Sequence, residues 1–109
     1  MNLAIIGVGY WGSKIAETAR LLPNTKVKTF DIDDNYQQDS IDAAVVATPA
    51  ETHYEVTKSL LERGIACLVE KPIADTLNKV QHLIGIAEAK NTVLQSGHIL
   101  LFTPTTEYI

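Results

Sequence analysis

The 109-residue sequence contains one cysteine, one tryptophan and one methionine, and it has no long apolar run. A lone cysteine excludes an internal disulfide and a zinc site built from several thiolates. No apolar run approaches the roughly 20 residues that a membrane-spanning helix needs, so we expect no membrane span. Nine Lys and Arg against thirteen Asp and Glu exclude a generally basic nucleic-acid binder. Because no basic region precedes the first apolar run, the sequence also predicts no signal peptide and a reducing, cytoplasmic location.

The remaining sequence alternates between short apolar runs and segments with helical spacing of apolar residues. Strands are expected at residues 1–6, 26–30, 43–47, 65–69 and 93–96. Helices are expected at residues 13–22, from Pro49 to about Arg63, and at 76–90. This pattern predicts an α/β fold, a doubly wound parallel sheet of about five strands in three α/β/α layers, because the strands are apolar on both faces. We interpret residues 1–109 as a single domain.

The start of the second helix carries its own signal. Thr48, Pro49 and Glu51 match a capping box, with Thr48 as the N-cap, Pro49 at the first helical position and Glu51 reaching back. Gly64 is expected to end the same helix in a left-handed conformation.

A glycine-rich turn follows the first expected strand and leads into the first helix. Its sequence is Gly7-Val8-Gly9-Tyr10-Trp11-Gly12. Gly7 permits a tight turn, Gly9 leaves room for a pyrophosphate near the backbone, and Gly12 lets helix and strand pack closely. The N–H groups near Tyr10 and Trp11 would hold the diphosphate at the helix N-terminus.

An acidic residue stands where such a turn requires one. Asp31 lies 19 residues after Gly12, at the end of the next expected strand. It would accept hydrogen bonds from the adenine-ribose hydroxyls, and its charge favours NAD over NADP. Ile32 is the candidate to line the adenine. One alternative stays open: the glycines serve packing alone and Asp31 is a solvated loop acid.

Four motifs, in order, resemble the N-terminal half of the Gfo/Idh/MocA oxidoreductase family. The first is the glycine turn with its tryptophan. Thr48 and Pro49 with His53 are similar to the family's segment beside the nicotinamide ribose, and an exposed helical histidine is the alternative for His53. Residues 70–72 resemble its Glu-Lys-Pro motif. Gly97, His98 and Pro104 resemble the segment that leads into the second domain.

The resemblance implies roles for the remaining candidate residues. Lys71 would bind substrate hydroxyls and assist proton transfer, Glu70 would orient Lys71, and Pro72 would follow a cis peptide bond. His98 is a further candidate base. The alternative for Lys71 is a surface lysine before a turn proline, which is the usual case for a lone Lys-Pro. The alternative for Glu70 is a solvated side chain.

The chain departs from the family pattern in two places. The resemblance implies a large second domain that supplies most of the family's substrate pocket, and we expect this chain, which stops at Ile109, to lack it. Residues 32–42 are also too few for the usual helix and strand, although they can span about 36 Å, against the roughly 20 Å that the crossover needs. The expected strand order is therefore 2-1-3-4-5, with the strand at 26–30 on the edge, protected by Lys26 and Lys28.

These observations support three functional interpretations. The first is an NAD-binding oxidoreductase domain that transfers hydride between NAD and a secondary alcohol of a sugar or cyclitol once a partner completes the site. The second is a regulatory module that binds NAD(H) without chemistry, and the third is a structural remnant. The apolar C-terminal segment, residues 99–102 and the tail to Ile109, predicts a homo-oligomer.

Overall fold

The computed structural model describes residues 1–7, 9–31, 33–36 and 39–97. The five strands are β1 (Asn2–Ile6), β2 (Lys26–Phe30), β3 (Ala43–Val46), β4 (Ala66–Glu70) and β5 (Leu94–Gly97). The helices are α1 (Tyr10–Ala19), the short 3₁₀ helix η1 (Ala50–Thr52), α2 (His53–Glu62) and α3 (Leu77–Ala89). None of these helices is long and apolar enough to cross a membrane.

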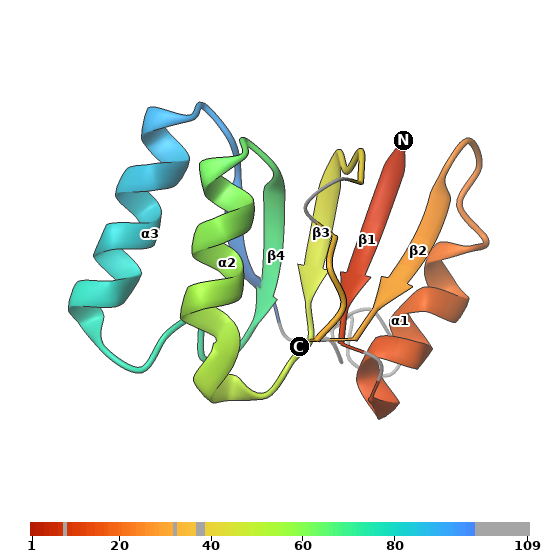
Figure 1. Cartoon of the computed structure of the whole chain (residues 1–109), viewed down its shortest axis with the longest axis horizontal. Coiled ribbons are helices and arrows are strands. Elements are labelled where there is room, and N and C mark those ends of the chain that lie inside the picture. The colour runs from red at the N-terminus through yellow and green to blue at the C-terminus, as the bar shows by residue number, and fades with distance from the viewer. Residues whose placement is uncertain (8, 32, 37–38, 98–109) are drawn as a thin grey trace, which may run out of the picture.

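All five strands are parallel and form one sheet in the order β2-β1-β3-β4-β5 (Figure 1). This order confirms the predicted Rossmann-like α/β fold. It also places β2 at the edge, as the short connection after it required. Among the described residues, no strand pairs with the outer side of β2, and Lys26 and Lys28 of this strand are exposed.

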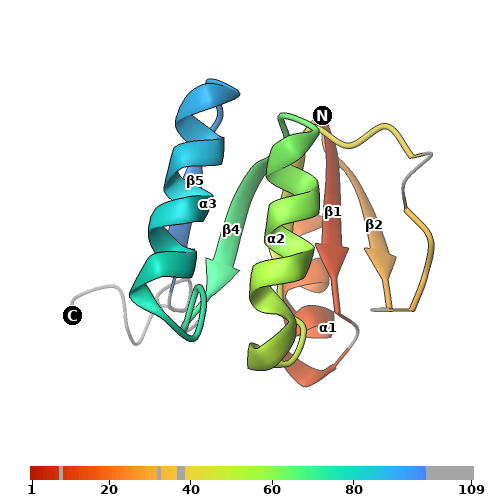
Figure 2. The ribbon, with the colours of Figure 1, turned by 60° about the vertical axis from the view of Figure 1, so that its left-hand side comes forward.

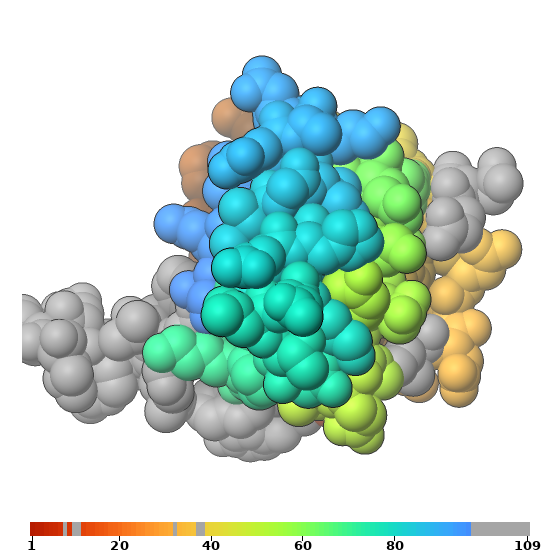
Figure 3. Space-filling view, turned by 90° about the vertical axis from the view of Figure 1, so that its left-hand side faces the viewer, coloured from red at the N-terminus to blue at the C-terminus, as the bar shows by residue number. Residues whose placement is uncertain are grey.

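The helices cover the sheet from both sides. Helices α2 and α3 pack against each other on one face, and α1 lies on the other face behind β1 and β2 (Figure 2). Figure 3 looks onto the α3 side and shows the two helices as a continuous outer layer. Successive side chains of β1 point to opposite faces of the sheet. Ala4 and Ile6 therefore pack in the core between the sheet and helices α2 and α3, whereas Ile5 packs with Ala16 of α1 on the other face.

The larger core holds the chain's only cysteine. Cys67 is 3% exposed on β4, among apolar side chains from α2 and α3. Burial raises the pKa of this thiol to about 12, so it stays protonated at neutral pH. Cys67 is therefore a small core residue, as its position inside an apolar strand predicted.

Two helix starts differ from the sequence predictions. Helix α1 begins at Tyr10, three residues before the predicted start, because the glycine turn leads straight into it. The capping box at Thr48 was wrong: Pro49 is extended, with ψ at 146°, and η1 intervenes before α2. Thr48 turns inward at 6% exposure, and its hydroxyl oxygen accepts a hydrogen bond from the Thr52 hydroxyl at 2.7 Å. Gly64 does end α2 with a positive φ of 76°.

The connection between β2 and β3 forms no helix or strand within its described residues. Its Tyr36 ring packs 5.5 Å from the Phe30 ring, centroid to centroid. The Arg63 guanidinium, at the end of α2, donates to the carbonyl oxygens of Tyr36 (3.3 Å) and Asp39 (2.7 Å). One arginine and one aromatic pair thus hold the connection against the domain.

Close backbone packing joins the glycine turn to its neighbours. A Cβ atom on Gly12 would lie 1.9 Å from the Gly7 carbonyl oxygen. Gly7 has a φ of 114°, and a Cβ there would lie 2.6 Å from the Ala47 carbonyl oxygen. No side chain fits at either position, so both glycines are needed for packing before any ligand is considered.

We predict that Gly12→Ala lowers the free energy of unfolding by about 2–3 kcal/mol, because the added methyl group must displace backbone. Gly85 provides the matched control, since a Cβ there, inside α3, would meet nothing within 4 Å. Gly85→Ala should raise stability by about 0.5–1 kcal/mol through its higher helix propensity. Urea unfolding midpoints measure both. Equal stability of the two variants would mean that the turn relaxes freely.

A candidate dinucleotide site at the carboxyl edge of the sheet

The candidate residues gather because the strands are parallel and in register. Ile6 at the end of β1 pairs with Phe30 of β2 and with Val46 of β3, and Val46 pairs with Val69 of β4. The residues that follow these strands therefore lie side by side at one edge. Gly7 donates its N–H to the Phe30 carbonyl oxygen at 2.7 Å, which places it next to Asp31. Open α/β sheets bind ligands at this edge.

The glycine turn has the geometry of an anion cradle. A Cβ atom on Gly9 would meet nothing within 4 Å, in contrast to Gly7 and Gly12, so the space in front of Gly9 is open. Gly9 is the N-cap of α1, no side chain that the structure describes caps this end, and the first turn contains no acidic residue. The first N–H groups of α1 are thus left for another acceptor, and the helix dipole favours an anion there. These features fit the diphosphate of a dinucleotide.

Asp31 lies on the exposed side of this cradle, directly after β2. Its N–H donates to the Asp34 carboxylate at 2.7 Å, and the Asp34 N–H donates to the Asp31 carbonyl oxygen at 3.0 Å. This tight turn fixes the Asp31 backbone beside the glycine turn. An acid in this position suits the ribose hydroxyls of a bound adenosine.

His53 joins the loops that follow β3 and β4. The residue is 2% exposed, so the alternative of an exposed helical histidine was wrong. Nδ1 lies 2.6 Å from the Pro72 carbonyl oxygen, and Nε2 lies 2.8 Å from the Thr48 carbonyl oxygen. Carbonyl oxygens only accept, so both contacts are hydrogen bonds when both ring nitrogens carry hydrogen, and a neutral ring donates to one at a time. His53 thus sets the spacing between these two loops.

Glu70 and Lys71 end β4 at the same edge. Glu70 is half-buried and Lys71 is exposed, with no ion pair to any described residue. The Lys71–Pro72 peptide bond is cis, as the family resemblance implied. An ammonium at the end of a parallel strand can reach a ligand in the crevice and polarise an oxygen there.

Several predicted residues cannot be placed. Ile32, His98 and the C-terminal segment that was predicted to form a homo-oligomer lie outside the described residues. For Tyr10 and Trp11 the structure describes the helical backbone, and the predicted contacts of their side chains stay predictions.

The role of His53 was missed because its partners are carbonyl oxygens from two different loops. Neither Thr48 nor Pro72 is special as an acceptor, since every residue has a carbonyl group. One signal was present: a histidine six residues after the predicted apolar strand at 43–47, on a helix that must face the sheet.

We predict that His53→Ala lowers the free energy of unfolding by about 2–4 kcal/mol, because it removes a buried ring and leaves at least one of the two loop carbonyl groups without its donor. Asn and Gln place an amide near the positions of Nδ1 and Nε2 respectively, so each should restore part of the loss. His82 is the control, since it is exposed on α3 and bonds the Tyr54 hydroxyl at 2.6 Å. His82→Ala should cost less than about 1 kcal/mol in chemical denaturation. Equal costs for the two histidines would contradict the bridging role.

Comparisons with known proteins agree with this geometry. Residues 18–98 match the family described as oxidoreductases with an NAD-binding Rossmann fold, Gfo/Idh/MocA. UDP-N-acetylglucosamine 3-dehydrogenase of Acidithiobacillus ferrooxidans is 35% identical over 69 residues, which cover 63% of this chain and 22% of the relative. Its solved structure superimposes with a TM-score of 0.78 at 28% identity, over 99% of this chain and 41% of that one.

Two further similarities extend the comparison. The 2,7-anhydro-N-acetylneuraminate hydratase of Mediterraneibacter gnavus is 26% identical over 128 residues, covering 99% of this chain and 34% of the relative. GenD2 of gentamicin A biosynthesis, solved with NAD, shares the fold with a TM-score of 0.84, over 95% of this chain and 36% of that one. The chain thus spans about a fifth to two fifths of these relatives. By its sequence and its fold, this chain belongs to the Gfo/Idh/MocA oxidoreductase family and forms that family's NAD-binding Rossmann domain.

Proposed function

We propose that this domain binds NAD in preference to NADP at the carboxyl edge of its sheet. The open space in front of Gly9, at an uncapped helix N-terminus, carries the proposal. The first N–H groups of α1 would hold the diphosphate, Asp31 would accept from the adenine-ribose hydroxyls, and the loop at Thr48 and Pro49 would border the nicotinamide ribose. The Asp31 carboxylate would repel the 2′-phosphate of NADP.

We further propose that the domain serves hydride transfer with a hydroxyl group of a sugar derivative, once another polypeptide segment completes the substrate pocket. Bound NAD supplies the hydride acceptor. Lys71 would bind the substrate hydroxyl and assist its proton transfer, Glu70 would orient Lys71, and His53 would position their loop from beneath. Two of the similar proteins are named for sugar derivatives, which supports this substrate class. The expected cytoplasmic location stays a prediction.

A second candidate function is a regulatory module that binds NAD(H) without chemistry, because the open space at Gly9 and the N-terminus of α1 would bind the cofactor without any substrate-binding residue. Lys71 distinguishes the two functions, because a sensor has no need of a substrate-binding ammonium.

We predict that Gly9→Ala keeps the fold and weakens NADH binding by on the order of tenfold, because the new methyl group occupies the space that the diphosphate needs. Asp31→Ala should weaken it by about 1–3 kcal/mol through the lost ribose hydrogen bonds. Asp33→Ala is the matched control, since Asp33 is an exposed acid in the same loop. Nicotinamide fluorescence measures the affinities. If the fully folded protein binds no NADH, or if all three variants bind it like the unchanged protein, this function is wrong.

Lys71→Ala should leave the NADH dissociation constant within about twofold and abolish any NAD-dependent oxidation of a sugar hydroxyl. Lys58→Ala on α2 is the control and should change neither quantity. Turnover is followed by NADH absorbance with a panel of nucleotide sugars and cyclitols. An equal loss of affinity and turnover would make Lys71 a cofactor contact instead. Unchanged turnover would refute its catalytic role.

A further inference from the structure

One side chain joins the loops that follow β3 and β4 at the candidate dinucleotide site. His53 Nδ1 lies 2.6 Å from the Pro72 carbonyl oxygen, and His53 Nε2 lies 2.8 Å from the Thr48 carbonyl oxygen. Among the described residues, no other side chain forms a hydrogen bond or an ion pair between these two loops. Because Pro72 directly follows Lys71, the spacing of the loops also sets the position of the Lys71 backbone.

The His53 ring needs two hydrogen atoms to make both contacts. A carbonyl oxygen only accepts, so each ring nitrogen must carry a hydrogen atom for its contact to be a hydrogen bond. Neutral imidazole carries one such hydrogen. Its second nitrogen would present a lone pair to a carbonyl oxygen within hydrogen-bond distance, and two lone pairs repel each other. The described spacing of the two loops is therefore the spacing that the imidazolium form supports.

No carboxylate holds the charge of this ring. The surrounding segments carry the titratable side chains of Glu51, Tyr54, Glu55, Glu70, Lys71 and Asp75, and α3 carries Lys79 and His82. None of them forms a hydrogen bond or an ion pair with the ring: Tyr54 bonds His82 at 2.6 Å, and Asp75 pairs with Lys79 at 3.0 Å. Histidine is the side chain whose charge ordinarily changes between about pH 5 and 8. The second hydrogen of His53 is thus held by carbonyl dipoles alone.

The two carbonyl groups differ in their access to water. Pro72 is exposed and its contact with Nδ1 is only partly buried, whereas Thr48 is 6% exposed and its contact with Nε2 is buried. Water can replace a lost donor at Pro72. The Thr48 carbonyl group would be left buried without a donor, which costs more free energy. The neutral ring therefore keeps its hydrogen on Nε2.

We propose that His53 is a positioning residue whose proton decides where the Lys71 loop lies. The imidazolium holds Pro72 close to the loop at Thr48. When Nδ1 gives its proton to solvent water, the ring keeps Thr48 and releases Pro72, and the backbone that carries Lys71 moves away. The movement itself needs no cofactor, whereas its consequence for a substrate-binding Lys71 rests on the proposed function.

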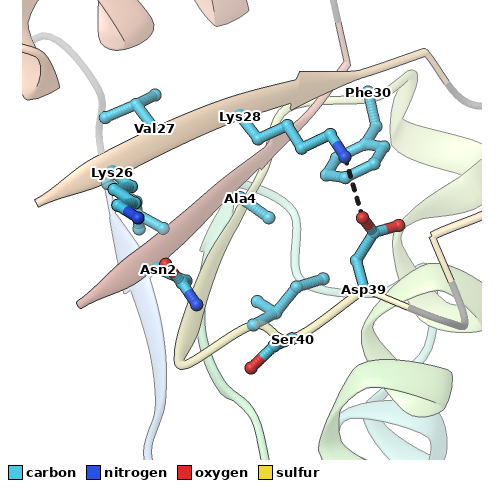
Figure 4. A pocket seen from close by; sticks show the side chains of 10 residues that line it. Asn2, Ala4, Lys26, Val27, Lys28, Phe30, Asp39 and Ser40 are labelled. Atoms are coloured by element: carbon cyan, nitrogen blue, oxygen red, sulfur yellow. Dashed lines mark hydrogen bonds and ion pairs between the residues drawn. The ribbon is translucent and has the colours of Figure 1, made fainter.

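The connection after β2 provides an internal reference. It is held by the ion pair between Lys28 and Asp39 at 2.8 Å (Figure 4) and by the hydrogen bond from Arg63 to the Asp39 carbonyl oxygen. Lysine, arginine and aspartate ordinarily keep their charges between about pH 5 and 8. Residues 39–41 should therefore stay in place over the range in which His53 changes its charge.

NMR spectra of the unchanged protein without cofactor test the proposal between about pH 5 and 8.5. Long-range ¹⁵N–¹H correlation of the imidazole rings should show hydrogen on both His53 nitrogens at the acidic end and on Nε2 alone at the other end. The amide signals of Lys71, Ile73 and Ala74 should move with the same midpoint. Those of Thr48 and of residues 39–41 should move much less.

Variants separate the bridge from the general loss of a buried ring. His53→Asn keeps a donor near the position of Nδ1, so the signals of the Lys71 loop should stay near their acidic positions at every pH. His53→Gln keeps a donor near the position of Nε2 and should hold the same signals near their alkaline positions. His82→Gln is the control, since it removes an exposed histidine of α3 and should leave the movement unchanged.

The spectra of the unchanged protein decide the outcome even if a His53 variant fails to fold. A His53 ring that keeps one protonation state over the whole range, or a neutral ring with its hydrogen on Nδ1, would overturn the proposal. Loop signals that follow another histidine would overturn it as well. Because no NADH is present, these outcomes are independent of the binding experiment that tests the proposed function.

Discussion

The fold depends on the contact between the backbones of the first strand–helix turn and the end of β3. At Gly12 a single methyl group would lie 1.9 Å from the Gly7 carbonyl oxygen, and at Gly7 it would meet the Ala47 carbonyl oxygen. This contact lets α1 lie flat against β1 and β2 while its N-terminus points at the sheet edge. The same two glycines therefore fix the packing of one helix and the direction of the N–H groups that an anion would meet.

Only the middle glycine separates packing from ligand binding. A Cβ atom on Gly9 would meet nothing within 4 Å, so packing alone does not explain why this position is a glycine. A turn kept for packing alone requires glycine at two positions, and this chain has it at three. That difference favours a dinucleotide cradle over a structural remnant, and it became visible only once the space around each glycine was known.

The sequence predicted the sheet almost completely. Apolar runs marked β1, β3 and β4, although β2 is the alternating sequence KVKTF and β5 is LQSG, and the length of the connection after Phe30 was enough to predict the strand order. The region between β3 and α2 could not be predicted as well. There the Thr48 hydroxyl bonds another threonine hydroxyl and does not cap the helix. The His53 ring contacts two carbonyl oxygens from neighbouring loops, which no local sequence pattern indicates. Local patterns describe helix ends well when the end faces water, and this one faces the neighbouring loop.

The Arg63 side chain holds the β2–β3 connection through the main chain of the connection, because both acceptors of the guanidinium are carbonyl oxygens. Such an anchor sets the length of the connection, which must keep those two oxygens within reach of the guanidinium, and does not depend on which residues supply them. Tyr36 and Asp39 are constrained separately, because their side chains contact the Phe30 ring and the Lys28 ammonium. In this part of the molecule, selection would therefore act on chain length, on one arginine and on these two side-chain contacts.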